Sequence, residues 1–274
     1  MRTHLPLATT GVFQDRFRYV RIGVGPRVLV VLPGLSLTNR APGKLTLLGY
    51  AQGFRSLTTE HTLYIVQRPS MLRTAASTRD IAAEYADMLR HEFGTASIDL
   101  IGISTGGMIA QYLALDHSDL IDRLVLVVSG ARLAPRGRAI CARWRELAAS
   151  GQWRRLHGDM AAEAVDGTYA KALARAFLAL TGEPPTAVEA VDFITTVDAV
   201  LSQDSRPRLA GLAMPVLLIG AQHDAFFPTA GLQETAAPIP NARLNIYPRT
   251  GHGLPKKHAA QMATEIHAFL THGR

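Results

Sequence analysis

The 274-residue sequence contains a single cysteine, Cys141, and no long hydrophobic run. One cysteine excludes an internal disulfide and a cysteine-rich zinc site, and it suits a reducing compartment. No apolar stretch approaches the ~20 residues that span a bilayer, so we expect no transmembrane segment. Met1–Val20 carries several charges and has no long apolar core, which does not fit a signal peptide. We therefore expect a cytoplasmic protein with no membrane partner.

The sequence also lacks a concentrated block of one charge, although its formal net charge is +7. Its 29 Lys and Arg residues are spread along the chain. The densest group consists of Arg136, Arg138, Arg143, Arg145, Arg154 and Arg155. These arginines alternate with apolar residues at helical spacing, which is typical of solvated helix faces and not of a nucleic-acid surface. We expect no nucleic-acid partner.

Short apolar runs alternate with helical patterns in the first half of the chain. Four of these runs are typical of buried parallel strands: 27–32, 62–66, 98–103 and 122–129. A helix separates the second and third runs, because Ser77 fits its N-cap and Gly94 its C-terminal end. The alternation predicts an α/β fold built on a parallel, doubly wound sheet.

The alternation stops after residue 130 and resumes at about residue 206. Between them, helical patterns occur at 140–147, 169–180 and 187–201, and Gly182–Pro185 separates the last two. We predict a core of residues 1–130 and 206–274 with a helical cap at 131–205. Because the insertion follows a strand directly, its position favours a lid over the ligand-binding edge of the sheet, although extra surface helices fit the pattern too.

The segment Gly102-Ile103-Ser104-Thr105-Gly106 matches the pattern G-x-S-x-G between a predicted strand and a predicted helix. Small residues let the strand and the helix approach each other at a sharp turn, which projects the serine hydroxyl clear of the sheet. A glycine-rich turn of an ordinary α/β protein also fits this motif. The rest of the chain must therefore supply partners for the serine.

A serine hydroxyl needs a base to take its proton and a carboxylate to orient that base. The chain offers Ser104, Asp224 and His252 in the order that this turn predicts, each just beyond the carboxyl end of a predicted strand. His223 is a rival base, but it precedes the acid in the same loop, whereas His252 lies between two glycines. For the oxyanion hole we predict two backbone amides, those of Leu35 and Thr105.

These motifs together resemble the α/β-hydrolase superfamily, in particular its lid-bearing esterases, lactonases and haloperoxidase-like members. The segments that match are Leu32–Gly34, Gly102–Gly107, Pro215–Gly220 with Asp224 and Pro228, and Gly251-His252. The resemblance implies a mostly parallel eight-stranded sheet with helices on both faces and a helical cap inserted after the sixth strand. The chain departs from the family at Pro33, where members often carry histidine, and at 67–72, where many carry D-x-R-G-x-G-x-S. A serine nucleophile argues against epoxide hydrolases and haloalkane dehalogenases.

The predicted pocket is mostly apolar and is formed by Ser36, Leu37, Met71, Phe226, Phe227 and Leu254. An apolar pocket suits hydrolysis of a carboxylic ester or lactone through an acyl-enzyme. C–C bond hydrolysis, acyl transfer on the same triad and a small-ligand receptor with little turnover remain alternatives. An aminopeptidase would need cap carboxylates, and the spacing singles out none of Glu146, Glu163, Asp192 and Asp198.

The sequence offers no clear cluster of metal ligands, so we expect neither a metal nor an organic cofactor. The expected partner is a small-molecule ester, lactone or other acyl substrate. The sequence leaves open whether the chain forms a homodimer.

Overall fold

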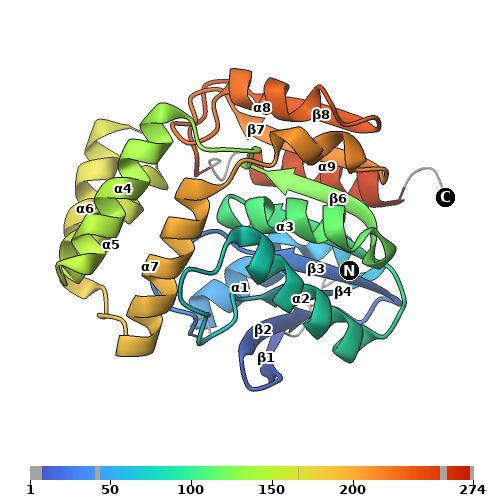
Figure 1. The fold of residues 1–274 in the computed structure, drawn as a ribbon, viewed down its shortest axis with the longest axis horizontal. Helices are drawn as coiled ribbons and strands as arrows, with labels where there is room; N and C mark the ends of the chain where they lie inside the picture. Colours follow the sequence, from blue (N-terminus) through green and yellow to red (C-terminus); the bar gives the residue numbers. More distant parts are fainter. Residues whose placement is uncertain (1–7, 41–43, 166, 254–257, 272–274) are drawn as a thin grey trace, which may run out of the picture.

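In the computed structural model, which describes residues 8–40, 44–165, 167–253 and 258–271, the chain folds around an eight-stranded sheet (Figure 1). The strands lie in the order β1-β2-β4-β3-β5-β6-β7-β8. Strand β2 pairs antiparallel with β1 and β4, and all other neighbours are parallel. The predicted mostly parallel sheet is therefore confirmed. The strands are β1 (Ala8–Phe13), β2 (Phe17–Ile22), β3 (Arg27–Leu32), β4 (His61–Val66), β5 (Ile98–Ile103), β6 (Ile121–Val127), β7 (Val216–Ala221) and β8 (Ala242–Tyr247).

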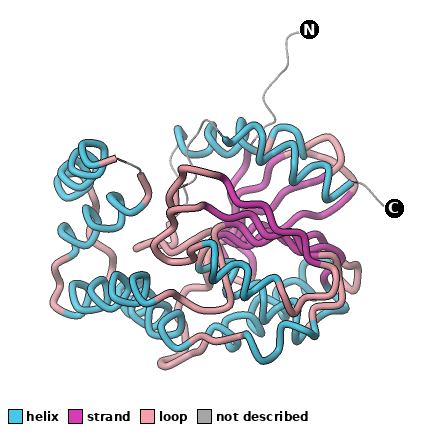
Figure 2. The backbone as a smooth tube through the Cα atoms, turned by 90° about the horizontal axis from the view of Figure 1, so that it is seen from above, coloured by secondary structure: helices cyan, strands magenta, loops and turns pink. Residues whose placement is uncertain are grey.

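Helices lie on both faces of this sheet (Figure 2). They are α1 (Lys44–Gly53), α2 (Thr78–Phe93), α3 (Thr105–Asp116), α4 (Pro135–Ala149), α5 (Trp153–Glu163), α6 (Thr168–Thr181), α7 (Ala187–Ser202), α8 (Thr229–Ala236) and α9 (Ala259–Thr271). Short 3-10 turns are η1 (Arg55–Leu57), η2 (Ser118–Leu120) and η3 (Arg206–Gly211). Among the described residues, no helix combines the length and the apolar character needed to cross a bilayer.

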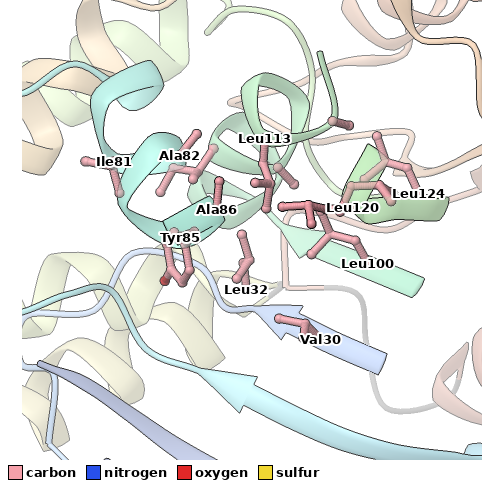
Figure 3. Packing of buried hydrophobic residues seen from close by; sticks show 14 of the residues in the cluster. Val30, Leu32, Ile81, Ala82, Tyr85, Ala86, Leu100, Leu113, Leu120 and Leu124 are labelled. Carbon is pink, nitrogen blue, oxygen red and sulfur yellow. The ribbon is translucent and has the colours of Figure 1, made fainter. Parts of the chain in front are cut away.

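The near-continuous apolar runs arise because the central strands are covered on both faces. Along β3, Val30 and Leu32 belong to a buried cluster with residues of α2 and α3. Leu29 and Val31 belong to a second cluster, with α1 and α9, on the opposite face. Figure 3 shows the first cluster, where Leu32 of β3 lies near Tyr85 of α2. Side chains of a strand alternate between faces, so two helix layers require apolar residues at every position.

Helix α2 begins and ends where the sequence predicts. The Ser77 hydroxyl accepts a hydrogen bond from the Asp80 amide at 3.1 Å, and the Asp80 carboxylate accepts from the Ser77 amide at 2.8 Å. The Ser77 hydroxyl and amide, both bonded to that carboxylate, hold the pKa of Asp80 below its usual value. At the other end Gly94 has φ of 72°, a left-handed conformation that suits glycine.

Four inserted helices, α4 to α7, lie between β6 and β7 and extend beyond one side of the sheet (Figure 1). All of them fall inside the predicted range 131–205, and α4, α6 and α7 contain the three predicted helical patterns. The sequence did not predict α5, because Gly158 interrupts its apolar pattern. Helix α7 links the group to the core, since Phe193 and Val197 are fully buried against it.

Helix α6 is the outermost of the inserted helices and packs mainly against α5 (Figure 2). It buries none of its side chains, and its apolar stripe faces solvent. Tyr169 is 93% exposed, Leu173 73%, Phe177 60% and Leu180 79%. The helical period in this segment was therefore predicted correctly, but the period alone does not tell which face is covered.

Candidate active site

Ser104 occupies the sharp turn between β5 and α3. Its φ is 51° and its ψ is −118°, a strained conformation for a residue with a side chain. The Ser104 amide donates to the Val127 carbonyl at 2.9 Å, and the Ser104 carbonyl accepts from the Ser129 hydroxyl at 2.8 Å. The Ser104 side chain makes no capping hydrogen bond to α3, so the Ser104 hydroxyl is free for other partners. The neighbouring strand thus holds the strained turn in place.

The flanking glycines are required by the close approach of strand and helix. A Cβ on Gly102 would lie less than 3.0 Å from the Gly107 Cα. A Cβ on Gly106 would lie less than 3.0 Å from the Leu32 carbonyl oxygen, at the end of β3. Real Cβ atoms do not approach backbone this closely, so the backbone would have to move. Both glycines of the motif therefore have a steric role.

The three predicted triad residues meet at the carboxyl edge of the sheet. His252 follows β8, and its Nε2 lies 3.0 Å from the Ser104 Oγ. Its Nδ1 lies 2.8 Å from Oδ2 of Asp224, which follows β7. The rival base, His223, is exposed to solvent. This geometry is that of a nucleophile, a base and an orienting acid.

Asp224 is held in place by the loop that follows β7. The residue is 3% exposed, and its second oxygen, Oδ1, accepts hydrogen bonds from the Phe226 amide at 2.7 Å and the Phe227 amide at 3.2 Å. A buried carboxylate with both oxygens occupied cannot rotate without losing hydrogen bonds. The loop after β7 therefore sets the orientation of the His252 ring.

The two predicted oxyanion donors line the same cavity as Ser104. Thr105 is the first residue of α3, and the first N–H groups of a helix have no acceptor within it. The loop after β3 runs against the serine, since a Cβ on Gly34 would lie 3.4 Å from the Ser104 Cβ. Leu35 follows in that loop, and both Leu35 and Thr105 line the cavity at Ser104. Their role as oxyanion donors stays a prediction.

A cavity of about 260 Å³ opens beside Ser104 and His252. The core lines it with apolar side chains that include Met108 and the predicted residues Phe226 and Phe227. The inserted helices contribute Cys141, Trp144, Met160, Glu163, Ala164 and Val200. The inserted helices thus form part of the wall around the candidate nucleophile.

Three of the predicted pocket residues lie elsewhere, and Leu254 lies outside the described residues. Met71 is 62% exposed, because Asp192 of α7 accepts the Met71 amide at 3.0 Å and holds this loop with its side chain outward. Leu37 is buried in a cluster with the inserted helices. The Ser36 hydroxyl donates to the Thr38 carbonyl at 2.9 Å within its own loop.

The structure also shows which of the four cap carboxylates named in the sequence analysis lies at the cavity. Glu163 lines the cavity and lies 3.7 Å from Lys171. Asp192 is buried and accepts hydrogen bonds from the Met71 and Leu72 amides, so its carboxylate has a structural role. Asp198 pairs with Arg145 at 3.1 Å on the outer side, and Glu146 is exposed. Only Glu163 of these four is placed to contact a bound molecule.

Arg68 and Ser129 were not singled out in the sequence. Arg68 is 3% exposed, and it donates to the Ser36 carbonyl at 2.6 Å, beside the predicted oxyanion donor Leu35. Burial lowers the pKa of the Arg68 guanidinium to about 10, so it remains charged at neutral pH. Ser129 holds the Ser104 carbonyl, as described above. An arginine two positions after the end of an apolar strand was the signal for Arg68; Ser129 gave no signal.

Cys141 lines the cavity but is 3% exposed, and burial raises the pKa of its thiol to about 12. Because the thiolate is the nucleophile, we expect iodoacetamide at pH 8 to alkylate the native protein ~10³-fold more slowly than the unfolded chain. The native rate should rise about tenfold per pH unit from pH 7 to 9, since the thiol stays protonated throughout. Mass spectrometry of the adduct gives both rates, and equal rates in the two states would contradict the buried environment.

Among the described residues, no group of three or more His, Cys, Asp and Glu side chains is placed to hold a metal ion.

Comparison with known proteins agrees with this architecture. A family model described as alpha/beta hydrolase fold matches residues 45–259. The chain is 29% identical over 269 residues to the polyketide synthase ThaQ of Burkholderia thailandensis, a match that covers 93% of this chain but 12% of that protein. It is 25% identical over 246 residues to the pimeloyl-[acyl-carrier protein] methyl ester esterase of Chromobacterium violaceum, covering 84% of this chain and 89% of that protein.

Among solved structures, the enol-lactonase from Burkholderia xenovorans LB400 has a TM-score of 0.77 at 18% identity, covering 96% of this chain and all of that one. At this identity the likeness concerns the fold. The family match includes Ser104, Asp224 and His252 and extends over most of the chain. The strand order, the strained serine turn and the family match lead to one conclusion: the chain belongs to the α/β-hydrolase fold family.

Proposed function

We propose that this protein hydrolyses a carboxylic ester or lactone through an acyl-enzyme on Ser104. The observation that carries the proposal is the hydrogen-bonded series Ser104–His252–Asp224, with distances of 3.0 and 2.8 Å, at a cavity with apolar walls. The name of the esterase relative, which acts on a methyl ester, supports the same reaction class.

In the first half of the reaction, the Ser104 Oγ attacks the acyl carbon while its proton passes to His252 Nε2. Asp224 accepts the Nδ1–H of His252 and stabilises the imidazolium that forms. The carbonyl oxygen becomes an oxyanion that the amides of Leu35 and Thr105 stabilise, each donor being worth about 3–4 kcal/mol. The imidazolium then gives its proton to the departing alcohol oxygen, and the acyl group stays on Ser104.

In the second half, a water molecule gives a proton to His252 and attacks the acyl carbon. The carboxylic acid leaves, and the Ser104 Oγ recovers its proton from the imidazolium. The apolar walls near the serine, among them Trp144, Phe226 and Phe227, favour an uncharged acyl group over a charged one. Glu163, the one carboxylate among the described residues that line the cavity, is paired with Lys171 and is therefore no isolated partner for a substrate ammonium.

A fluorophosphonate tests this proposal directly, because it phosphorylates activated serines. We expect a single adduct on the wild-type protein and none on Ser104→Ala, measured by intact mass. Ser36→Ala is the matched control: its hydroxyl lies in a neighbouring loop outside the cavity, so labelling should persist. Turnover of p-nitrophenyl esters of increasing acyl length then reports the acyl size. Folded wild-type protein that takes no adduct and turns over no ester would overturn the proposal in favour of a ligand receptor.

A further inference from the structure

A second concave site lies on the outer side of the inserted helices. A groove between α4, α5 and α6 is lined by Arg143, Arg155, Asp159, Arg175 and Ala179. Figure 1 shows these three helices side by side at the left of the molecule. Successive residues of a helix are about 100° apart. Arg143 therefore points away from Cys141, two positions earlier on α4, which faces the Ser104 cavity. On α4, the groove and the cavity are therefore lined from different faces of the helix.

One buried carboxylate organises this groove. Asp159 is 7% exposed, and each of its oxygens faces a different arginine: Oδ1 accepts a hydrogen bond from the Arg175 Nε at 3.0 Å, and Oδ2 forms an ion pair with the Arg143 Nε at 3.1 Å. Both arginines turn their Nε toward Asp159, so their terminal NH₂ groups are left to donate elsewhere. Gly158 allows this arrangement, because a Cβ there would lie 2.6 Å from the Arg175 carbonyl oxygen.

The third guanidinium is almost unengaged. Arg155 is exposed, and its side chain makes one long hydrogen bond, from NH1 to the Gln152 Oε1 at 3.4 Å. Asp159 is the one carboxylate among the described residues that line the groove, so three positive charges face one negative charge. A guanidinium presents several N–H donors in a fixed plane and matches the geometry of phosphate oxygens. The groove therefore has guanidinium donors and excess positive charge that are available to bind an anion.

We propose that the groove between α4, α5 and α6 binds a phosphoryl group, with Arg143, Arg155 and Arg175 as its donors. A phosphate dianion balances the excess charge of the groove, and its oxygens can accept from all three guanidinium groups. Asp159 acts by holding two of these groups in place. This site goes beyond the ester hydrolysis proposed for Ser104 and does not depend on it.

Isothermal titration with inorganic phosphate, at constant ionic strength set with sodium chloride, tests the proposal. We expect saturable binding of one phosphate to the wild-type protein and at least about tenfold weaker binding to Arg155→Gln. Arg154→Gln is the matched control, because Arg154 is the exposed neighbour on α5 that does not line the groove. Circular dichroism without phosphate confirms that each variant is folded.

A parallel titration with phenyl phosphate distinguishes the source of the phosphoryl group. Binding as tight as that of inorganic phosphate indicates a groove for a phosphoryl group carried by a larger molecule, and selective binding of inorganic phosphate indicates the free ion. Either result supports the proposal if the binding is weaker in Arg155→Gln than in the wild-type protein. Absence of saturable binding to the wild-type protein, or equal losses in Arg155→Gln and Arg154→Gln, would overturn it. Because the readout is binding, it stays independent of ester turnover.

Discussion

Ser104→Ala is expected to lower kcat for an activated ester by about 10⁴- to 10⁶-fold. This is the largest effect on kcat that we expect from a substitution that leaves the protein folded. Alanine removes the Oγ that lies 3.0 Å from His252 Nε2, and no covalent intermediate can form. The amides of Leu35 and Thr105 remain in the variant, so a residual rate above the uncatalysed reaction is expected from them. Steady-state kinetics with a p-nitrophenyl ester measures the loss.

A double variant makes this prediction sharper. Ser104 and His252 act as one unit, so Ser104→Ala/His252→Ala should be no slower than Ser104→Ala alone within a few-fold. If the two side chains acted separately, their losses would multiply instead. Ser36→Ala, the control serine of the neighbouring loop, should retain its rate within a few-fold. Activity of Ser104→Ala within tenfold of the wild type would assign the reaction to another nucleophile.

The placement of the three triad residues was predictable because it depends on strand ends. Ser104, Asp224 and His252 each follow an apolar run, and parallel strands bring their carboxyl ends to one edge. The short distances among these residues follow from that topology. Local patterns also predicted α2, whose capping residue Ser77 and final Gly94 have effects confined to a few neighbours.

The pocket was less predictable because long-range contacts decide it. Met71 and Leu72 are held by Asp192, about 120 positions later in the chain, and no local pattern reports that contact. The cap carboxylates illustrate the same limit: Glu163 of α5 faces the cavity, whereas Asp198 of α7 faces away from it. Which face of an inserted helix meets the core is set by how α4 to α7 pack together, and the helical period does not encode it.

Elements with little apolar content escaped prediction for a different reason. Strand β1 is an edge strand whose Thr9 and Thr10 are exposed, so its pattern is that of a polar loop. Helix α5 contains Gly158, which weakens a helical pattern, yet this glycine lets α6 approach α5 closely. In both cases the tertiary contact stabilises a segment whose local preference is weak.

Gly106→Ala is expected to lower the free energy of unfolding by about 2–5 kcal/mol, because the added methyl group would clash with backbone atoms. The new Cβ would lie less than 3.0 Å from the carbonyl oxygens of Leu32 and Pro33. These are backbone atoms, so rotation of a side chain cannot relieve the clash. Helix α3 and the end of β3 must move apart. Guanidinium unfolding followed by circular dichroism measures the change.

Gly49→Ala is the matched control, because the same methyl group on α1 would meet nothing within 4 Å. Replacing a glycine within a helix should raise the free energy of unfolding there by about 0.5–1 kcal/mol, opposite in sign to Gly106→Ala.

A second measurement connects the steric argument to function. The movement in Gly106→Ala separates Ser104 from the loop that carries Leu35, and a displacement of about 1 Å at a reacting centre costs about 10²-fold in rate. Fluorophosphonate labelling of the fraction that remains folded should therefore slow by at least that factor, whereas Gly49→Ala should label at the wild-type rate. Wild-type stability and labelling in Gly106→Ala would mean that strand and helix do not meet closely at this turn, and the steric reason for the motif would be lost with it.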